Sequence, residues 1–501
     1  MRKLSFIILS GILALAPAAS IAQTIPAKVV SLFNNADAEI SEYYSYSGPM
    51  ARGGRLGLSV LPRIAVPDCE EAGHLKEMIS RSGGDPVDMP AKGCSAMDLR
   101  LSALWWDGAA MPDGWVSEDN DYSILVFKTV ASWNVPFIGE SGLSRLIDNG
   151  LRRLPGRIES FEELVRKART YRKAVELMEG SFTIDTHCDL PEDYDKGRSV
   201  GTRTLSQTGV PKMDEGRLDT QVLISFLWQG PLDEASLRQA VAKNLAQIAE
   251  IKDDVAKYPH LCGIATTPEE AHALKAEGKK AFLIGLENGY GIGNDLGNIK
   301  RMRDLGIIYI TLCHFSDNSI CNTSSHRGSD PAKGLTEFGK EVVREMNRQG
   351  LMIDLSHPSA QTFWDCVRLS EAPIICSHSG AKAIYGHDRG LDDRQLKALA
   401  ENGGVIQVYT VADFLRPSGA TIDDFMAHFN HCVEVAGAEH VGIGSDFDGG
   451  GGVIGCNGVN DLVNVTVKML EHGYTPDQIK GFWGGNFMRV MENVQSIANR
   501  D

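Results

Sequence analysis

Eight short apolar segments, separated by longer helical stretches, restrict the possible folds of this chain of 501 residues more than any other feature. Each has the length of a buried strand, whereas the segments between them have helical spacing. Strands that alternate with helices indicate an α/β fold with a parallel sheet. The eight predicted strands are Phe182–Thr186, Val222–Leu227, Ala281–Leu286, Ile308–Cys313, Met352–Leu355, Ile374–Ser377, Val405–Val408 and Val441–Gly444.

Helices are predicted between these strands, and several begin with a capping residue. Thr267 precedes Pro268, and Thr421 is followed three residues later by Asp424, which is the spacing of a capping box. Eight strand–helix repeats over about 320 residues predict a (β/α)8 TIM-type barrel. A doubly wound open sheet is the alternative, because a strand count from one sequence is easily wrong by one. The predicted helices include Glu234–Val255, Pro268–Glu277, Glu337–Arg348, Arg394–Glu401 and Asp423–Ala436.

Residues 1–22 have the pattern of a secretory signal peptide. Arg2 and Lys3 precede an apolar run, Leu4–Ala16, and small residues follow it up to Ala22. The apolar run is too short to favour a membrane span, although an uncleaved anchor is the alternative. We therefore expect an exported protein, periplasmic or secreted, with no stable membrane anchor.

Residues 23–158 differ from the rest of the chain. They contain glycine-rich and proline-rich patches, few sustained periodic runs and no chemical motif, so we treat them as an N-terminal extension of unknown role. Within them, the apolar stretch Tyr122–Phe137 predicts one or two strands. A charged amphipathic helix at about Ser160–Leu177 leads into the barrel domain, which we place at 159–501.

Composition and charge restrict the partners of this chain. The formal net charge of −15 argues against a nucleic-acid ligand and fits a protein that handles small molecules. Export would permit disulfides, and Cys69 and Cys94, both in loop-like sequence, are the best candidates for one. Cys313, Cys366 and Cys376 lie in apolar runs, so we predict that they are buried and free.

Residues that can bind metals stand where the predicted strands end. In a barrel of parallel strands, the carboxyl ends of all strands meet at one mouth. His187 and Asp189 close the first strand, and side chains two residues apart in an extended chain point the same way. The ends of later strands carry further candidates: Glu287, His314, His357, His378 and Asp446.

The joint pattern is more informative than any single residue, since a lone histidine after a strand is more often structural than a ligand. Burying four histidines with several carboxylates in one mouth is costly unless a metal compensates the charge. Imidazole and carboxylate ligands without thiolates suit zinc, with manganese, cobalt or iron as alternatives. Five ligands exceed one four-coordinate site with an open position, so two ions bridged by a carboxylate fit better.

Six short motifs occur in the order and spacing of a known family. They are His187-Cys188-Asp189, Glu287, Thr311-Leu312-Cys313-His314, Asp354-Leu355-Ser356-His357, Ser377-His378-Ser379 and Gly444-Ser445-Asp446-Phe447-Asp448-Gly449. From about Phe182 to Val494 the chain resembles the membrane (renal) dipeptidase family, a branch of the amidohydrolase-like barrels. The resemblance implies a zinc dipeptidase with two ions per chain, tolerance of a D-residue at the C-terminal position of the substrate, and a homodimer as the usual assembly.

The resemblance also implies a set of metal ligands. His187 and Asp189 would hold one zinc ion, His357 and His378 would hold the other, and Glu287 would bridge the two. A water between the ions would then have its pKa lowered towards neutrality, which would supply hydroxide at pH 7.

The remaining roles implied by the resemblance concern catalysis and substrate binding. Asp446 would take the proton of the attacking water, and His314 would contact the substrate and stabilise the oxyanion. Asp448 competes with Asp446 for the role of base. Arg389 would bind the free carboxylate of the dipeptide. The family commonly has asparagine after this arginine, where this chain has Gly390; without the resemblance, Arg389 reads as a solvated surface residue.

Two other functions are compatible with the same residues. One is a related metal hydrolase acting on lactones, cyclic amides or phosphotriesters, although those barrels usually bridge their metals with a lysine where this chain has Glu287. The other is a peptide-binding protein that kept the fold without activity. That hypothesis predicts at least one lost ligand, and none is apparent in the sequence.

Overall fold

The computed structural model describes most of the chain beyond residue 172, namely residues 173–189, 206–324 and 332–498. Shorter described pieces are 45–49, 55–59, 128–130, 170–171, 199–202, 204 and 329–330. The chain divides into two compact units, 1–175 and 176–501. The signal segment and the cysteine pair Cys69 and Cys94 lie outside the described residues.

The first unit contains a small antiparallel sheet. Its strands β1 (Ser45–Pro49), β2 (Arg55–Ser59) and β3 (Lys128–Val130) pair in the order β1-β2-β3. Strand β3 lies inside the apolar stretch for which the sequence predicts one or two strands. Within the helix predicted at about Ser160–Leu177, residues 170–171 and 173–177 are helical, and the helix continues to residue 179.

The second unit is built on eight parallel strands, and all eight lie where the sequence predicts them. Most of their residues are buried, as expected for strands covered on both faces. Two short strands, β6 (Cys262–Ile264) and β11 (Gly390–Leu391), were not predicted and pair at the side with β7 and β10. The eight strands are β4 (Ile184–Asp189), β5 (Thr220–Phe226), β7 (Lys280–Glu287), β8 (Ile307–Thr311), β9 (Met352–Asp354), β10 (Ile375–Ala381), β12 (Val405–Val408) and β13 (Val441–Ile443).

The two ends of this sheet meet, so the strands form a nearly closed barrel. The order along the sheet is β13-β12-β10-β9-β8-β7-β5-β4. Beyond β13, the Asp446 amide donates to the His187 carbonyl at 3.0 Å, and the Asp189 amide donates to the Phe447 carbonyl at 2.9 Å. These bonds join the first strand to the last, which excludes the open sheet. They also bring Asp446 beside His187.

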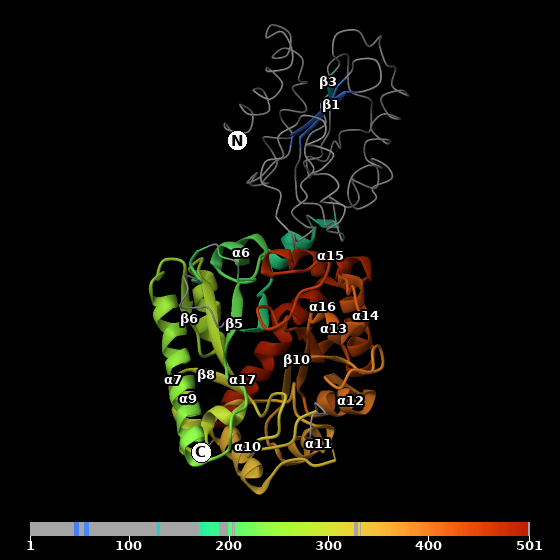
Figure 1. Cartoon of the computed structure of the whole chain (residues 1–501). Coiled ribbons are helices and arrows are strands. Elements are labelled where there is room, and N and C mark those ends of the chain that lie inside the picture. Colours follow the sequence, from blue (N-terminus) through green and yellow to red (C-terminus); the bar gives the residue numbers. More distant parts are fainter. Residues whose placement is uncertain are drawn as a thin grey trace. The chain divides into compact units, whose positions relative to one another are not determined.

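Helices surround the strands, with α7 and α14 on opposite sides in Figure 1. The five predicted helices are present as α7 (Glu234–Ala256), α8 (Pro268–Ala276), α10 (Glu337–Gln349), α12 (Asp393–Glu401) and α14 (Ile422–Ala436). The predicted caps are formed, since the Thr267 side chain accepts from the Glu270 amide and Thr421 forms a capping box with Asp424. The other helices are α6 (Val210–Glu215), α9 (Gly297–Asp304), α11 (Ala360–Leu369), α13 (Ala412–Leu415), α15 (Val463–Glu471), α16 (Pro476–Lys480) and α17 (Asn486–Ala498), with short helical turns at Gly289–Ile292, Ala438–His440, Val459–Asp461 and Gly481–Gly485.

The amino-terminal end of the barrel is covered by the last helix, α17. Phe487, Met491 and Val494 of this helix belong to one buried core cluster with residues from the amino-terminal parts of the strands, among them Ile184, Val222, Ala281, Ile308, Met352, Ile375 and Val405. This apolar contact seals one end of the barrel. The polar residues that follow the strands therefore gather at the other end, where the carboxyl ends lie.

The cysteines of the second unit are buried thiols. Among the described residues, eight cysteines are free and buried, including the three for which the sequence predicts this state: Cys313, Cys366 and Cys376. None of the described helices has both the length and the apolar character needed to cross a membrane.

Candidate metal centre

Five side chains predicted as metal ligands converge at the carboxyl end of the barrel. Nε2 of His187 lies 3.8 Å from Asp189 Oδ1 and 3.6 Å from Glu287 Oε2. On the other side of this glutamate, Oε1 lies 2.9 Å from His357 Nε2 and 3.4 Å from His378 Nε2. The Glu287 carboxylate thus stands between two groups of ligands, one on each of its oxygen atoms.

Three of these atoms lack the hydrogen bonds that buried polar groups normally form. His187 Nε2, Asp189 Oδ1 and Glu287 Oε1 are buried without a hydrogen-bond partner among the described residues, which is costly unless something else satisfies them. Tetrahedral zinc at its usual bond lengths places neighbouring ligand atoms about 3.3 Å apart. The separations between these nitrogen and oxygen atoms range from 2.9 to 3.8 Å, on either side of that value. The residues therefore fit a metal centre.

Hydrogen bonds behind the ligands orient two of the imidazole rings. The Tyr309 hydroxyl donates to the Thr186 carbonyl at 2.9 Å, so it accepts from Nδ1 of His187, which lies 2.9 Å away. The Ser377 hydroxyl donates to Asp354 Oδ2 at 2.6 Å and lies 2.9 Å from His378 Nδ1. With Nδ1 protonated, each ring presents the lone pair of Nε2 to the centre, as a metal ligand requires.

Burial and mutual repulsion shift the pKa values of the centre. Burial lowers the pKa of His357 and of His378 well below the usual histidine range, so these two rings are neutral. Burial and the charge of Glu287 raise the pKa of Asp189 well above its usual range. Burial opposes protonation of His187, but Glu287, Asp446 and Asp189 outweigh it and raise the His187 pKa to about 9. The carboxylates thus draw positive charge to the His187 position, whether a proton or a metal ion carries it.

Asp446 and Asp448 have different surroundings, although both have backbone φ angles in the left-handed region, 64° and 60°. Asp448 accepts from the Gln207 amide at 3.0 Å and from the Ser206 hydroxyl, so it holds a neighbouring loop. Asp446 faces the centre instead: a Cβ at Gly449 would lie 2.2 Å from Asp189 Oδ2 and 2.4 Å from Asp446 Oδ1. Burial raises the pKa of Asp446 to about 7, against the opposing effect of His187. This arrangement favours Asp446 as a base.

His314 lies beside the ligands, as predicted. One of its ring nitrogens forms a group with ligand atoms of Glu287 and His357, all within 4.8 Å of one another. Its ring centroid is 4.3 Å from that of His357. Burial lowers the pKa of His314 to about 4, so the ring is neutral at pH 7 and carries one N–H that can be donated.

Arg389 is buried rather than on the surface, which contradicts its reading as a solvated arginine. Only 1% of it is exposed. Nη1 donates to the Ser356 carbonyl, and Nη2 lies 3.2 Å from the His378 carbonyl and 3.0 Å from His357 Nε2. Nε has no hydrogen-bond partner among the described residues. Arg389 also borders a cavity of about 250 Å³, together with Lys382 and Asp388.

Comparison with known proteins agrees with this geometry. The model of the membrane dipeptidase family, peptidase family M19, matches residues 171–501. The chain belongs to this family. An uncharacterized dipeptidase of Schizosaccharomyces pombe is 34% identical over 350 residues, which is 64% of this chain and 83% of that protein.

Solved structures share the fold of the barrel unit. The crystal structure of the probable dipeptidase PvdM from Pseudomonas aeruginosa is 26% identical, with a TM-score of 0.62, over 66% of this chain and 99% of that one. A metallopeptidase of Rhodobacter sphaeroides, solved with a phosphinate mimic of the dipeptide L-Ala-D-Ala, is 24% identical, with a TM-score of 0.57, over 63% and 99%.

Membership in this family makes the chain a metallo-dipeptidase, a hydrolase of peptide bonds that depends on a metal cofactor. It decides against the two alternatives, a hydrolase of lactones, cyclic amides or phosphotriesters and a binding protein without activity. The second alternative also predicts a lost ligand, whereas all five predicted ligands converge in the structure.

Sequence reasoning missed the residues that support the ligands of this dipeptidase. Tyr309 contacts His187, but in the sequence it is one apolar-looking residue of a buried strand. Asp354 accepts from Ser377 at 2.6 Å and from Thr311 at 2.5 Å, and Asp185 accepts from Ser445 at 2.6 Å. Asp354 and Ser377 stand in two of the six motifs, but no supporting role was predicted for them. For Asp185 the signal was a charged residue inside a buried strand, because such a residue needs a partner.

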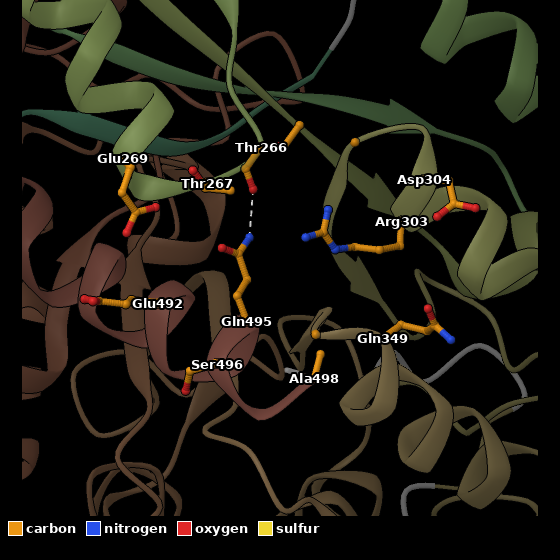
Figure 2. Close-up of a pocket in the computed structure, with 12 residues that line it drawn as sticks. Thr266, Thr267, Glu269, Arg303, Asp304, Gln349, Glu492, Gln495, Ser496 and Ala498 are labelled. Carbon is orange, nitrogen blue, oxygen red and sulfur yellow. Dashed lines mark hydrogen bonds between the residues drawn. The ribbon is translucent and has the colours of Figure 1, made fainter. Parts of the chain in front are cut away.

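A second hollow lies at the amino-terminal end of β8 and β9, far from these ligands in the barrel. Figure 2 shows the side chains of Arg303 and Gln495 pointing into it. Its volume is about 630 Å³. Gln495 donates to the Thr266 carbonyl at 2.7 Å. None of the residues that line it belongs to a group of potential metal ligands in the described part of the chain.

Proposed function

We propose that this dipeptidase is an exported enzyme that holds two zinc ions and cleaves dipeptides with a free C-terminal carboxylate. The observation that carries the metal proposal is the pair of ligand groups on the two oxygens of Glu287, with His187 and Asp189 on one side and His357 and His378 on the other. Imidazole nitrogens and carboxylate oxygens suit zinc. The signal pattern of residues 1–22 supports export.

The side chains around the centre have matching roles in peptide hydrolysis. When bound, the two ions supply Lewis-acid activation of the water and of the peptide carbonyl. Asp446 takes a proton from the attacking water and returns it to the leaving amine, for which a pKa of about 7 is well matched. Neutral His314 donates its N–H to the oxyanion that develops at the carbonyl carbon.

Arg389 is proposed to bind the carboxylate of the substrate. A guanidinium group matches a carboxylate with two parallel hydrogen bonds. In the structure, Nη2 of Arg389 donates a hydrogen bond to the lone pair of His357 Nε2. Since that nitrogen has one lone pair, its use as a metal ligand frees Nη2 for a carboxylate. Family membership supports tolerance of a D-residue beside this carboxylate.

The proposal is tested by metal analysis combined with a substrate panel. We expect about two zinc ions per active chain, and hydrolysis of L,L- and L,D-dipeptides. Peptides amidated at the C-terminus should be poor substrates. Finding manganese, cobalt or iron instead of zinc in the purified enzyme would overturn the proposed identity of the metal. One ion per active chain, or equal rates on amidated peptides, would contradict the two-ion site or the carboxylate requirement.

The role of Arg389 is tested by substitution. We expect Arg389→Ala to reduce kcat/KM for free dipeptides about 10- to 100-fold, the effect of losing hydrogen bonds to a charged group. The residual rate on amidated peptides should not fall. Lys382→Ala is the matched control, because Lys382 is a second cation on the same cavity but pairs with Asp388 near the surface. An equal loss on free and amidated substrates would contradict the carboxylate role.

Export is tested by locating the mature protein. We expect it in the periplasm or the medium, with its N-terminus near residue 23. Full-length protein retained in the membrane fraction would instead support the uncleaved anchor.

A further inference from the structure

Four aromatic rings form a continuous cluster on one side of the candidate metal centre. Trp228, in the segment after β5, packs edge-on against Phe226 and His314, with centroid distances of 5.1 and 5.3 Å. Phe315 packs against the other side of His314 at 4.2 Å. We call Phe226, Trp228, His314 and Phe315 the aromatic shelf. Through His314 and Phe315 the shelf reaches His357, at 4.3 and 5.0 Å.

Two members of the shelf are exposed to an extent that the fold does not require. The exposed fraction is 63% for Trp228 and 36% for Phe315. Exposing a tryptophan leaves a large apolar surface in water, and such exposure beside a site marks a contact for a ligand. The other exposed large apolar residues of the described part of the chain, Leu232, Ile384 and Ile454, also follow the carboxyl ends of strands. Of these, Leu232 lies four residues after Trp228.

The Trp228 end of the shelf lies across the barrel from Arg389, whereas His314 and Phe315 follow β8 and lie between the two. Trp228 follows β5 and Arg389 follows β10, and the sheet order places four steps between these two strands of the eight-stranded ring, β5-β7-β8-β9-β10. Glu287 ends β7 and His357 follows β9, so both lie on the path between them. A dipeptide whose carboxylate is at Arg389 and whose peptide bond is at Glu287 therefore directs its N-terminal residue towards β5.

We propose that the aromatic shelf binds the side chain of the N-terminal residue of the dipeptide, and that Trp228 makes the enzyme prefer a bulky apolar or aromatic side chain there. This inference rests on the proposed function of Arg389 as the carboxylate receptor. Rings at edge-to-face geometry with an open outer face suit another aromatic ring or a branched aliphatic group. A charged N-terminal side chain has no counterpart among the four residues of the shelf.

Two substrate series test the proposal. In the first, the N-terminal residue varies (Ala-Ala, Leu-Ala, Phe-Ala), and in the second the C-terminal residue varies (Ala-Leu, Ala-Phe). Trp228→Ala should reduce kcat/KM for Leu-Ala and Phe-Ala about tenfold and change it less than about twofold for Ala-Ala, the discrimination that one apolar contact provides. For the second series, kcat/KM should change as little as it does for Ala-Ala. Trp228→Phe, which keeps an aromatic ring, should restore most of the preference.

Leu232→Ala is the matched control, because Leu232 is an exposed apolar residue of the same loop outside the shelf; it should leave both series unchanged. An equal loss on all substrates, or a loss confined to the second series, would overturn the assignment of the shelf to the N-terminal residue. A wild-type enzyme that hydrolyses Ala-Ala but shows no preference within the first series would also overturn it. By contrast, a wild-type enzyme without activity on any dipeptide would contradict the proposed function itself.

Discussion

Both ends of the barrel carry a polar hollow, but the charged groups are exposed to solvent at one end and buried at the other. At the amino-terminal end, the charged side chains that line the cavity of about 630 Å³ include Glu492 and Asp304, which are exposed to solvent. Asp304 also pairs with Lys300 at 2.7 Å. At the carboxyl end, His187 and Glu287 are almost fully buried, and atoms of both lack hydrogen-bond partners among the described residues.

This difference shows why volume alone is a poor guide to function. An exposed charge is stabilised by water and needs no ligand. A buried carboxylate or imidazole without a partner is stable only if a proton, a cation or a substrate group satisfies it. The carboxyl end of the barrel concentrates such groups, and α17 closes the amino-terminal end with an apolar contact. Chemistry is therefore expected at one end only.

The strongest test of this contrast is a conservative change of one carboxylate at each end. Glu287→Gln should remove metal from the enzyme and lower kcat/KM by about 10³-fold or more, because the bridging charge and the Lewis acid are lost together. Glu492→Gln, the matched control in the amino-terminal cavity, should change neither the metal content nor kcat/KM. Metal content per chain and dipeptide hydrolysis are the measurements. Retention of two ions by the Glu287 variant would refute its bridging role.

A second test separates the two neighbouring aspartates of the carboxyl end. Asp446→Asn should lower kcat by about 10²- to 10⁴-fold while metal content stays at the wild-type value, because a general base is lost but no ligand is. Asp448→Asn should mainly lower the melting temperature, since Asp448 holds Ser206 and Gln207. If the Asp448 variant has the larger loss of kcat, the assignment of the base is reversed.

The positions of the strands and the convergence of the candidate ligands were predictable because both follow from local rules. Each strand is a short apolar run, and a parallel barrel brings all carboxyl ends to one mouth, so His187, Glu287 and His378 had to approach one another once the barrel was correct. The same rule placed His314 beside them. The five helices were predictable because their capping residues and apolar spacing are encoded locally.

Other features depend on contacts between distant residues and had no local signal. Tyr309 supports His187 across 122 residues of sequence, and Asp185 accepts from Ser445 across 260. The burial of Arg389 depends on carbonyl groups of Ser356 and His378 that the sequence does not place near it. Such pairings emerge only when the barrel closes, since they join strands that are far apart in the chain.

The tyrosine that supports His187 gives a smaller, graded test. Tyr309→Phe removes the phenol oxygen that orients His187 and leaves only the Ser377 hydroxyl, at 3.2 Å from Nδ1. We expect metal affinity to fall about 10- to 100-fold, the usual effect of losing a hydrogen bond behind a metal ligand. Tyr409→Phe is the matched control, because this buried tyrosine lies near Arg389 and its hydroxyl donates to the Phe414 carbonyl. Affinity is measured by competition with a chelator, and equal affinity in wild type and Tyr309→Phe would contradict the supporting role.

The smallest effect is expected at the amino-terminal end, from Arg303→Ala. This arginine points into the larger cavity in Figure 2 and is partly exposed. Substitutions of exposed residues without a special contact usually change stability by no more than about 0.5 kcal/mol. We therefore expect kcat/KM for dipeptides and metal content to equal those of wild type, and the melting temperature to change little. A loss of activity comparable to that of Arg389→Ala would show that the two ends of the barrel are coupled, because no ligand of the centre lies at this cavity.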